Sequence, residues 1–140
     1  MYKVGNVMGV SLPHPFDSSG YGFNVTTDRG SNFTGSTGTF KAPVTGVYFI
    51  RGSSGITFPV GTANCTMTIS IYVNSVERSR GNRMDFTTPA GIGTEGVQVA
   101  DCIALNVNDL VTVWTYQSSG AGRALNGVAT DNRFTALGPF

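Results

Sequence analysis

The chain has 140 residues, which is enough for one domain and too little for two sizeable cores. Hydrophobic residues make up 40% of it, so the composition excludes both a disordered chain and a membrane protein. Charged residues make up 12%, about half of the roughly 25% that is usual in soluble proteins. The net charge of +1 argues against a dedicated nucleic-acid-binding protein, which usually has a strong basic excess. The small number of charges indicates that part of the surface is not exposed to water.

The first residues contain Gly and Pro and no apolar run, so they do not form a targeting signal. We therefore expect the chain to be made and kept in the cytosol of its producer. The two cysteines, Cys65 and Cys102, are too few for a disulfide framework, and both lie in apolar strand-like runs. We interpret them as free, buried thiols, with a bridge between them as the alternative.

Nineteen glycines and six prolines punctuate the chain, and no window keeps a helical apolar stripe. Between them lie short β-branched and aromatic runs, the pattern of an antiparallel sandwich or barrel. The runs predict strands over 6–12, 21–27, 38–42, 46–57, 64–76, 96–106, 110–117 and 132–140. The stretch 78–95 contains three arginines, one proline and three glycines, and we expect an irregular surface excursion there.

Several of the predicted strands are apolar or small on both faces. In 110–117, Trp114 and Tyr116 alternate with Val111 and Val113, and in 96–106 the second face consists largely of Ala and Cys. A sheet with one wet face should instead alternate apolar with polar residues. We therefore expect one sheet to be covered on both sides, by its partner sheet and by another subunit. A wet face built from Thr and Ser is the alternative.

The strongest local pattern runs from Gly30 to Ile50 and contains Ser36-Thr37-Gly38-Thr39-Phe40-Lys41-Ala42-Pro43-Val44-Thr45-Gly46-Val47-Tyr48-Phe49-Ile50. It resembles the signature of the globular heads of the first complement component and their tumour-necrosis-factor-like relatives. Three further pieces resemble later parts of that signature in the same order: Ile69–Asn74, Ile103–Val113 and Asn132–Leu137. The resemblance covers nearly all of 23–140 and departs from the pattern at 58–66 and 78–96.

The resemblance implies an all-β, antiparallel jelly-roll β-sandwich that assembles as a homotrimer, with one sheet of each subunit packed about the threefold axis. Proteins of this superfamily bind through loops and trimer surfaces and do not catalyse reactions. We expect 1–12 to form an N-terminal arm or first strand that serves as a docking segment, and 13–140 to form the single jelly-roll domain. The resemblance makes five residues candidates for the trimer interface, each with the core as its alternative: Tyr72, Val111, Val113, Tyr116 and Phe134.

No catalytic constellation stands out, so we expect no enzyme activity. The single histidine, His14, lies between two prolines in an extended segment and has no motif partner. One histidine and two cysteines at unrelated positions do not form a zinc-type site. We therefore expect no catalytic residue, no cofactor and no metal. Calcium held by Asp101, Asp109 and Asp131 is the alternative.

Arg78-Ser79-Arg80-Gly81-Asn82-Arg83 is the basic cluster of the chain, and its guanidinium groups suit an acidic protein surface or a glycan. A solvated loop is the alternative. The segment 116–123, with an aromatic residue, then Gly and Ser, then Arg, is a second recognition candidate. The docking or recognition candidates are therefore Tyr2, Lys3, Arg78, Arg80, Arg83 and Arg123.

The expected jelly roll begins shortly after Met1 and has no stalk before it, which favours a building part over a receptor head. We interpret the chain as a virion structural protein, a trimeric capsid decoration (cement) protein that stabilises a phage shell and is assembled in the host cytoplasm. Its expected partners are its own copies and the major capsid protein or another virion protein, with no nucleic acid and no membrane. The alternatives are the receptor- or glycan-binding head of a phage fibre and a secreted complement-like lectin.

Overall fold

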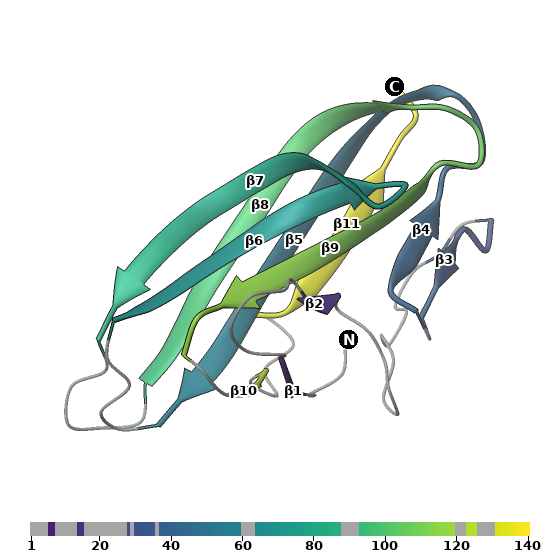
Figure 1. The fold of residues 1–140 in the computed structure, drawn as a ribbon. Helices are drawn as coiled ribbons and strands as arrows, with labels where there is room; N and C mark the ends of the chain where they lie inside the picture. The colour runs from purple at the N-terminus through teal and green to yellow at the C-terminus, as the bar shows by residue number, and fades with distance from the viewer. Residues whose placement is uncertain are drawn as a thin grey trace.

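The computed structural model describes residues 6–7, 14–15, 28, 30–35, 37–59, 64–87, 93–119, 123–125 and 131–140. These residues form strands and turns and contain no helix, so none of them belongs to a helix that could cross a membrane. Figure 1 shows the strands, which are β1 (Asn6–Val7), β2 (His14–Pro15), β3 (Phe33–Thr34), β4 (Thr39–Lys41), β5 (Gly46–Phe58), β6 (Cys65–Val73), β7 (Val76–Phe86), β8 (Gly93–Leu105), β9 (Leu110–Gln117), β10 (Arg123–Ala124) and β11 (Arg133–Leu137).

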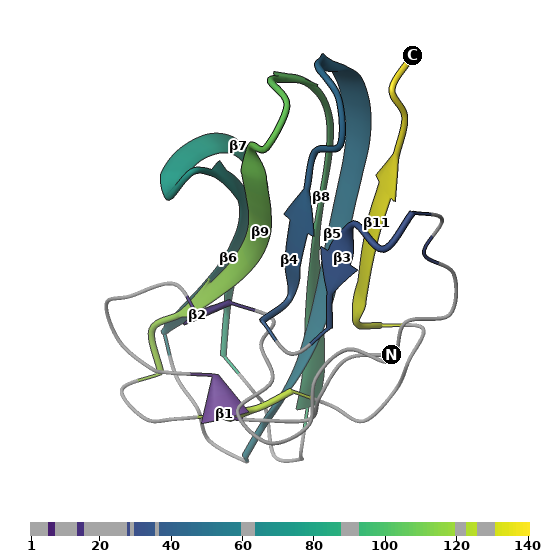
Figure 2. The same ribbon diagram turned by 90° about the vertical axis from the view of Figure 1, so that its right-hand side faces the viewer.

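Two antiparallel sheets form the body of the molecule, in the manner of a β-sandwich. We call the sheet with the strand order β3-β4-β9-β6-β7 the large sheet; β2 also pairs with its strand β9. We call the sheet with the order β11-β5-β8 the small sheet. Figure 2 shows β6, β7 and β9 in one layer and β5, β8 and β11 in the other. The predicted all-β, antiparallel class is confirmed for the described residues.

The core lies between the two sheets, because alternate side chains of each long strand point inward. On β9, Val111 and Val113 are buried, as are Ile50 and Ile56 on β5. The layers approach closely at Gly52 of β5, where an added Cβ would lie 2.5 Å from a Val113 methyl carbon. The two β9 valines therefore occupy the core of their own chain and do not form an outer face.

One side of the sandwich is closed where β7 of the large sheet meets β8 of the small sheet. The β6–β7 register shifts between Thr68 and Ser70, so β7 carries an extra residue near Gly81 and Asn82. This bulge brings the Asn82 side-chain oxygen within 2.6 Å of the backbone N–H of Gln98, which donates to it. The bulge in β7 thus ties together the edges of both sheets.

The opposite side is closed by aromatic packing and by a buried amide. Phe33 of β3 and Phe134 of β11 stack with ring centroids 5.1 Å apart. Asn132, which is buried, accepts a hydrogen bond from the backbone N–H of Gly55 at 2.8 Å. Since an unpaired buried N–H is costly, Asn132 stabilises the middle of β5 across 77 positions of sequence.

The observed strands agree with the predicted ones at 38–42, 46–57, 64–76, 96–106, 110–117 and 132–140, within a few residues at the ends. The predicted strand over 21–27 lies outside the described residues. The prediction of an irregular excursion over 78–95 is wrong, because Val76–Phe86 forms the long strand β7. Edge strands often carry charged side chains. The arginines of β7 therefore led us to expect a loop where the structure has an edge strand.

Candidate functional site

The outer face of the small sheet carries apolar and small side chains in cross-strand rows. Leu137, Phe49 and Cys102 lie opposite one another across β11, β5 and β8 and form one row. Val47 and Ala104 form the next row. Leu137 is 54% exposed and Val47 39% exposed, and Ala104 and Cys102 are exposed as well. We call the surface made by these five residues the small-sheet face.

A third row continues the small-sheet face and brings in a charge. It consists of Thr135, Arg51 and Ala100, all on the same outer side of the sheet. Arg51 is exposed at the edge of the apolar rows. The surface therefore has an apolar centre with a charged residue at one border.

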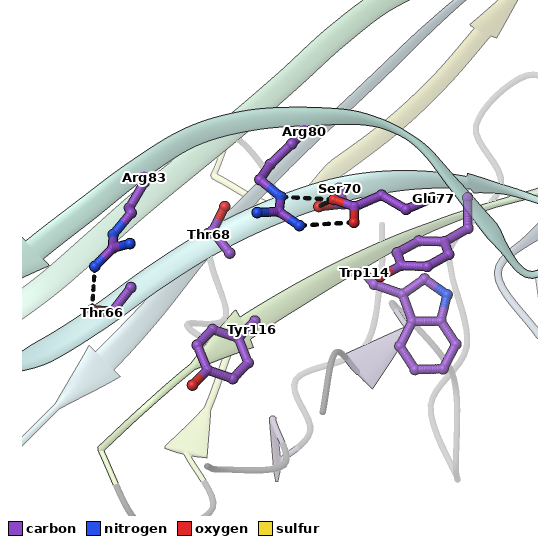
Figure 3. Close-up of a pocket in the computed structure, with 9 residues that line it drawn as sticks. Thr66, Thr68, Ser70, Glu77, Arg80, Arg83, Trp114 and Tyr116 are labelled. Carbon is purple, nitrogen blue, oxygen red and sulfur yellow. Dashed lines mark hydrogen bonds and ion pairs between the residues drawn. The ribbon is translucent and has the colours of Figure 1, made fainter. Parts of the chain in front are cut away.

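The outer face of the large sheet has a different character, because a shallow groove of about 280 Å³ crosses it. The β6–β9 register places Thr68 opposite Tyr116 and Ser70 opposite Trp114, and the β6–β7 register places Ser70 opposite Arg80. Figure 3 shows aromatic side chains of β9 on one side, arginines of β7 on the other and hydroxyl groups of β6 between them. The groove is lined by Thr66, Thr68, Ser70, Tyr72, Glu77, Arg80, Arg83, Trp114 and Tyr116.

The arginines of the groove are paired with carboxylates of the same strand. Arg80 Nε and Nη2 donate to both oxygens of Glu77, at 2.7 and 2.8 Å. Arg83 Nε and Nη2 donate to Asp85, each at 3.1 Å to one of its oxygens. The hydrogen bond from Arg80 lowers the pKa of Glu77, and the hydrogen bond from Thr66, followed by that from Arg83, lowers the pKa of Asp85. Both pairs therefore remain ionised at neutral pH.

The aromatic side of the groove is held by its own contacts. Tyr72 and Trp114 meet with ring centroids 5.8 Å apart at an interplanar angle of 55°. The indole Nε1 of Trp114 donates to the hydroxyl of Thr112 at 3.0 Å, which fixes the ring on the sheet. Burial, and then the Glu77 carboxylate, raise the pKa of Tyr72, so its phenol is protonated at neutral pH.

The structure separates the five residues predicted for the trimer interface. Val111 and Val113 are buried in the core and have no surface to offer a second copy. Phe134 is half-buried and packs against the same core beside Phe33. Tyr72 and Tyr116 lie on the outer face of the large sheet, in the groove. The interface prediction is therefore wrong for Val111 and Val113, whereas it stays a prediction for Tyr72, Tyr116 and Phe134.

The residues predicted for docking or recognition also do not form one site in the described part of the structure. Arg80 and Arg83 line the groove in ion pairs, and Arg78 is exposed on the same strand. Tyr2 and Lys3 lie outside the described residues, as does the side chain of Arg123, whose backbone pairs in β10 with β1. Within the predicted arm, 1–12, the structure describes only Asn6–Val7.

The two cysteines are unpaired, but they differ in exposure. Cys65 is buried, as predicted, and Cys102 is exposed on the small-sheet face, so the prediction of two buried thiols is wrong for Cys102. The sequence did not show which face of this strand is exposed, because the residues on its outer face are mostly small rather than polar. His14 pairs through its backbone in β2 with Thr115 of β9, and its side chain lies outside the described part.

The aspartates named for calcium do not form a cluster: in the described part of the chain, no three His, Cys, Asp or Glu residues lie together as metal ligands. Asp109 binds two neighbouring turns instead. Its oxygens accept the Asn106 backbone N–H and the Asn74 side-chain N–H, both at 2.8 Å. The Asn74 side-chain oxygen in turn accepts the backbone N–H of Leu110 at 2.9 Å. The carboxylate of Asp109 is therefore part of the fold.

These contacts predict an acid-sensitive step in stability. The backbone hydrogen bond from Asn106, and then the one from Asn74, lower the pKa of Asp109 in the folded chain below its ordinary value of about 3.9. A lowered folded pKa adds stability above the unfolded pKa, and this stability is lost as the pH falls through the folded value. We expect the urea midpoint of the wild type to fall below about pH 4 and that of Asp109→Asn to fall less steeply. Equal slopes in the two proteins would contradict this role.

Comparison of the sequence with protein-family models gives no matching family. Comparison with curated proteins gives no significant match. The function therefore has to be inferred from the surfaces described above.

Proposed function

We propose that this protein is a homotrimeric structural protein of a virion that decorates and stabilises a phage capsid shell. The observation that carries the proposal is the small-sheet face. Its rows join Leu137 to Phe49 and Cys102, and Val47 to Ala104, with exposed apolar surface across all three strands. Contiguous apolar surface on a soluble protein marks a place where another molecule binds.

The composition of the two outer faces favours the small sheet as the interface between copies. The cores of protein interfaces are depleted in charged residues, and the apolar rows of the small-sheet face fit that description. The outer face of the large sheet carries two ion pairs, Arg80–Glu77 and Arg83–Asp85. Burying these pairs would require their desolvation, which opposes association. We therefore propose the small-sheet face, on β5, β8 and β11, as the trimer interface in place of Tyr72 and Tyr116 on the large sheet.

The order of the strands supports the finer proposal of a jelly roll. Along the chain, β4 lies in the large sheet, β5 in the small sheet, β6 and β7 in the large sheet, β8 in the small sheet and β9 in the large sheet. Crossing repeatedly between two antiparallel sheets is characteristic of Greek-key and jelly-roll sandwiches. The trimeric state follows the resemblance to the complement and tumour-necrosis-factor-like heads.

Shell decoration would work by mass action. A protein that binds the assembled lattice and not the free shell subunits stabilises the lattice in proportion to its occupancy. A trimer presents each docking contact three times, so individually weak contacts gain from their effective concentration. The small charged fraction of 12% supports an assembly unit, and the phage shell is the partner that we propose for it.

Two measurements test the proposal. Light scattering after size exclusion should give three times the chain mass of 14.7 kDa at micromolar concentration. Empty shells of the virus that encodes this chain should bind the protein saturably and then resist heat to a higher temperature. A stable monomer would overturn the assembly, and a trimer that ignores the shells would overturn the decoration role alone.

A further inference from the structure

We propose that the groove on the outer face of the large sheet is a binding site for a neutral carbohydrate. The site lies on the sheet opposite the small-sheet face, so this inference does not depend on the proposed assembly. Its volume of about 280 Å³ falls just below the roughly 300–1,000 Å³ of drug-sized ligand sites. The groove therefore suits a small ligand, such as one or two sugar rings.

The floor of the groove consists of hydrogen-bond acceptors. Thr68 donates its hydroxyl proton to the backbone oxygen of Asn82 at 3.4 Å, and Ser70 donates to Glu77 at 2.7 Å. A hydroxyl that has donated its proton still offers acceptor lone pairs. Thr68 and Ser70 are two positions apart on β6, so their hydroxyl oxygens lie on the same face of the sheet, about 6.6 Å apart along the strand. Such a row suits a ligand that carries several hydroxyl donors.

The aromatic side of the groove supplies the apolar half of the chemistry. Trp114 and Tyr116 lie two positions apart on β9, both half-buried and both on the groove side of the sheet. In Figure 3 the two labelled rings stand on the same side of the hydroxyl row. A sugar ring combines a face of C–H groups with a rim of hydroxyls, and this combination matches aromatic rings beside polar oxygens.

The pairing of the groove arginines with carboxylates disfavours the binding of an anionic ligand. Arg80 and Arg83 are each bound in bidentate fashion by a carboxylate, and the two pairs sum to zero charge. A phosphate or sulfate would have to compete with Glu77 and Asp85 for the same guanidinium groups. The guanidinium N–H groups that do not contact the carboxylates can donate to neutral oxygens of a ligand. A neutral, hydroxyl-rich molecule therefore fits better than a phosphorylated one.

The chain contains a single tryptophan, and it lies in this groove. Its intrinsic fluorescence therefore reports on this site alone. The test titrates the full-length protein with a panel of soluble neutral oligosaccharides built from glucose, galactose, mannose and N-acetylglucosamine. Phosphorylated and sulfated forms of the same sugars form the second arm. We expect a saturable fluorescence change with at least one neutral sugar, with a Kd in the millimolar range or tighter, and no tighter binding of its anionic form.

Three variants localise the effect, with calorimetry as a second readout. Tyr116→Ala should weaken binding at least tenfold, and Thr68→Val should weaken it several-fold because one acceptor is lost, both with unchanged circular dichroism. Phe140→Ala is the matched control, since Phe140 is an aromatic residue that is 80% exposed and lies outside the groove. The control should bind as the wild type does.

The following outcomes overturn the proposal: no saturable signal from any neutral sugar up to about 10 mM, tighter binding of the anionic forms, or binding that Tyr116→Ala leaves intact. Because the panel consists of small soluble oligosaccharides that a single chain can bind, a variant that fails to assemble can still be tested. Failure of this site and failure of the trimer are therefore distinguishable.

Discussion

Ala104→Arg is expected to convert the assembled protein into monomers. Ala104 is exposed on β8 in the small-sheet face, opposite Val47, and its side chain has no role in the core. In a trimer built on this face, the new guanidinium would be buried without a partner at every interface. An unpaired buried charge costs about 2–5 kcal/mol, which weakens association by a factor of roughly 30 to several thousand.

The matched control is Val76→Arg. Val76 is 59% exposed at the start of β7, in the other sheet, so the same change of charge falls outside the small-sheet face. Light scattering should give monomers for Ala104→Arg and trimers for Val76→Arg and for the wild type. Monomers from both variants would assign the effect to added charge, and trimers from both would exclude the small-sheet face as the interface.

Cys102 provides a second measurement of the same assembly. Its thiol is exposed in the single chain, whereas Cys65 is buried and should contribute little signal. A thiol-reactive dye should therefore label Cys102 slowly in the trimer and quickly in the Ala104→Arg monomer. Fast labelling of a wild type that is trimeric by mass would place the interface elsewhere on the molecule.

The second large effect is expected inside the sandwich, at Gly52. An alanine Cβ at this position would lie 2.5 Å from one Val113 methyl carbon and 3.1 Å from the other. Overpacking of a well-filled core costs about 1–3 kcal/mol. Val113→Ala alone should cost about 2–3 kcal/mol, because it removes two buried methyl groups and leaves a cavity.

The double variant Gly52→Ala/Val113→Ala is the decisive measurement. Removing the two methyl groups opens the space that the new Cβ needs, and the nearest remaining side-chain atom, the Val113 Cβ, lies 3.3 Å away. We expect the double variant to be more stable than the sum of the single changes predicts, by about 1–3 kcal/mol of coupling. Urea unfolding of the four proteins gives this value. Strict additivity would mean that the two sheets do not meet at Gly52 and Val113.

The all-β class and most of the long strands could be read from the sequence, because alternation is a local property of an extended backbone. The burial of Tyr48, Ile50, Met67 and Val99 follows the same alternation. Strand β7 could not be read in this way, since an edge strand needs little apolar surface and its arginines look like those of a loop. Its pairing with β6 and its bulge contact with Gln98 depend on the fold.

The sequence identified several residues of the groove but did not predict that they form one site. Tyr72, Tyr116, Arg80 and Arg83 were all singled out, but for different roles and in different places. Trp114 was noted for its strand pattern and not as a site residue. What brings these side chains together is the register of β6 with β9 and with β7. Register is set by contacts between segments far apart in the chain, so no local pattern contains it.

Composition and period alone established an all-β chain with few charges and strands that carry two apolar or small faces. They could not establish which of the two faces turns inward. On β9 the tertiary structure turns Val111 and Val113 into the core, with Val113 against Gly52, and leaves Trp114 and Tyr116 outside. On β8 it leaves Cys102 and Ala104 outside. The physical reason is that alternation fixes only the period of a strand, whereas the choice of its buried face depends on the partner sheet that packs against it.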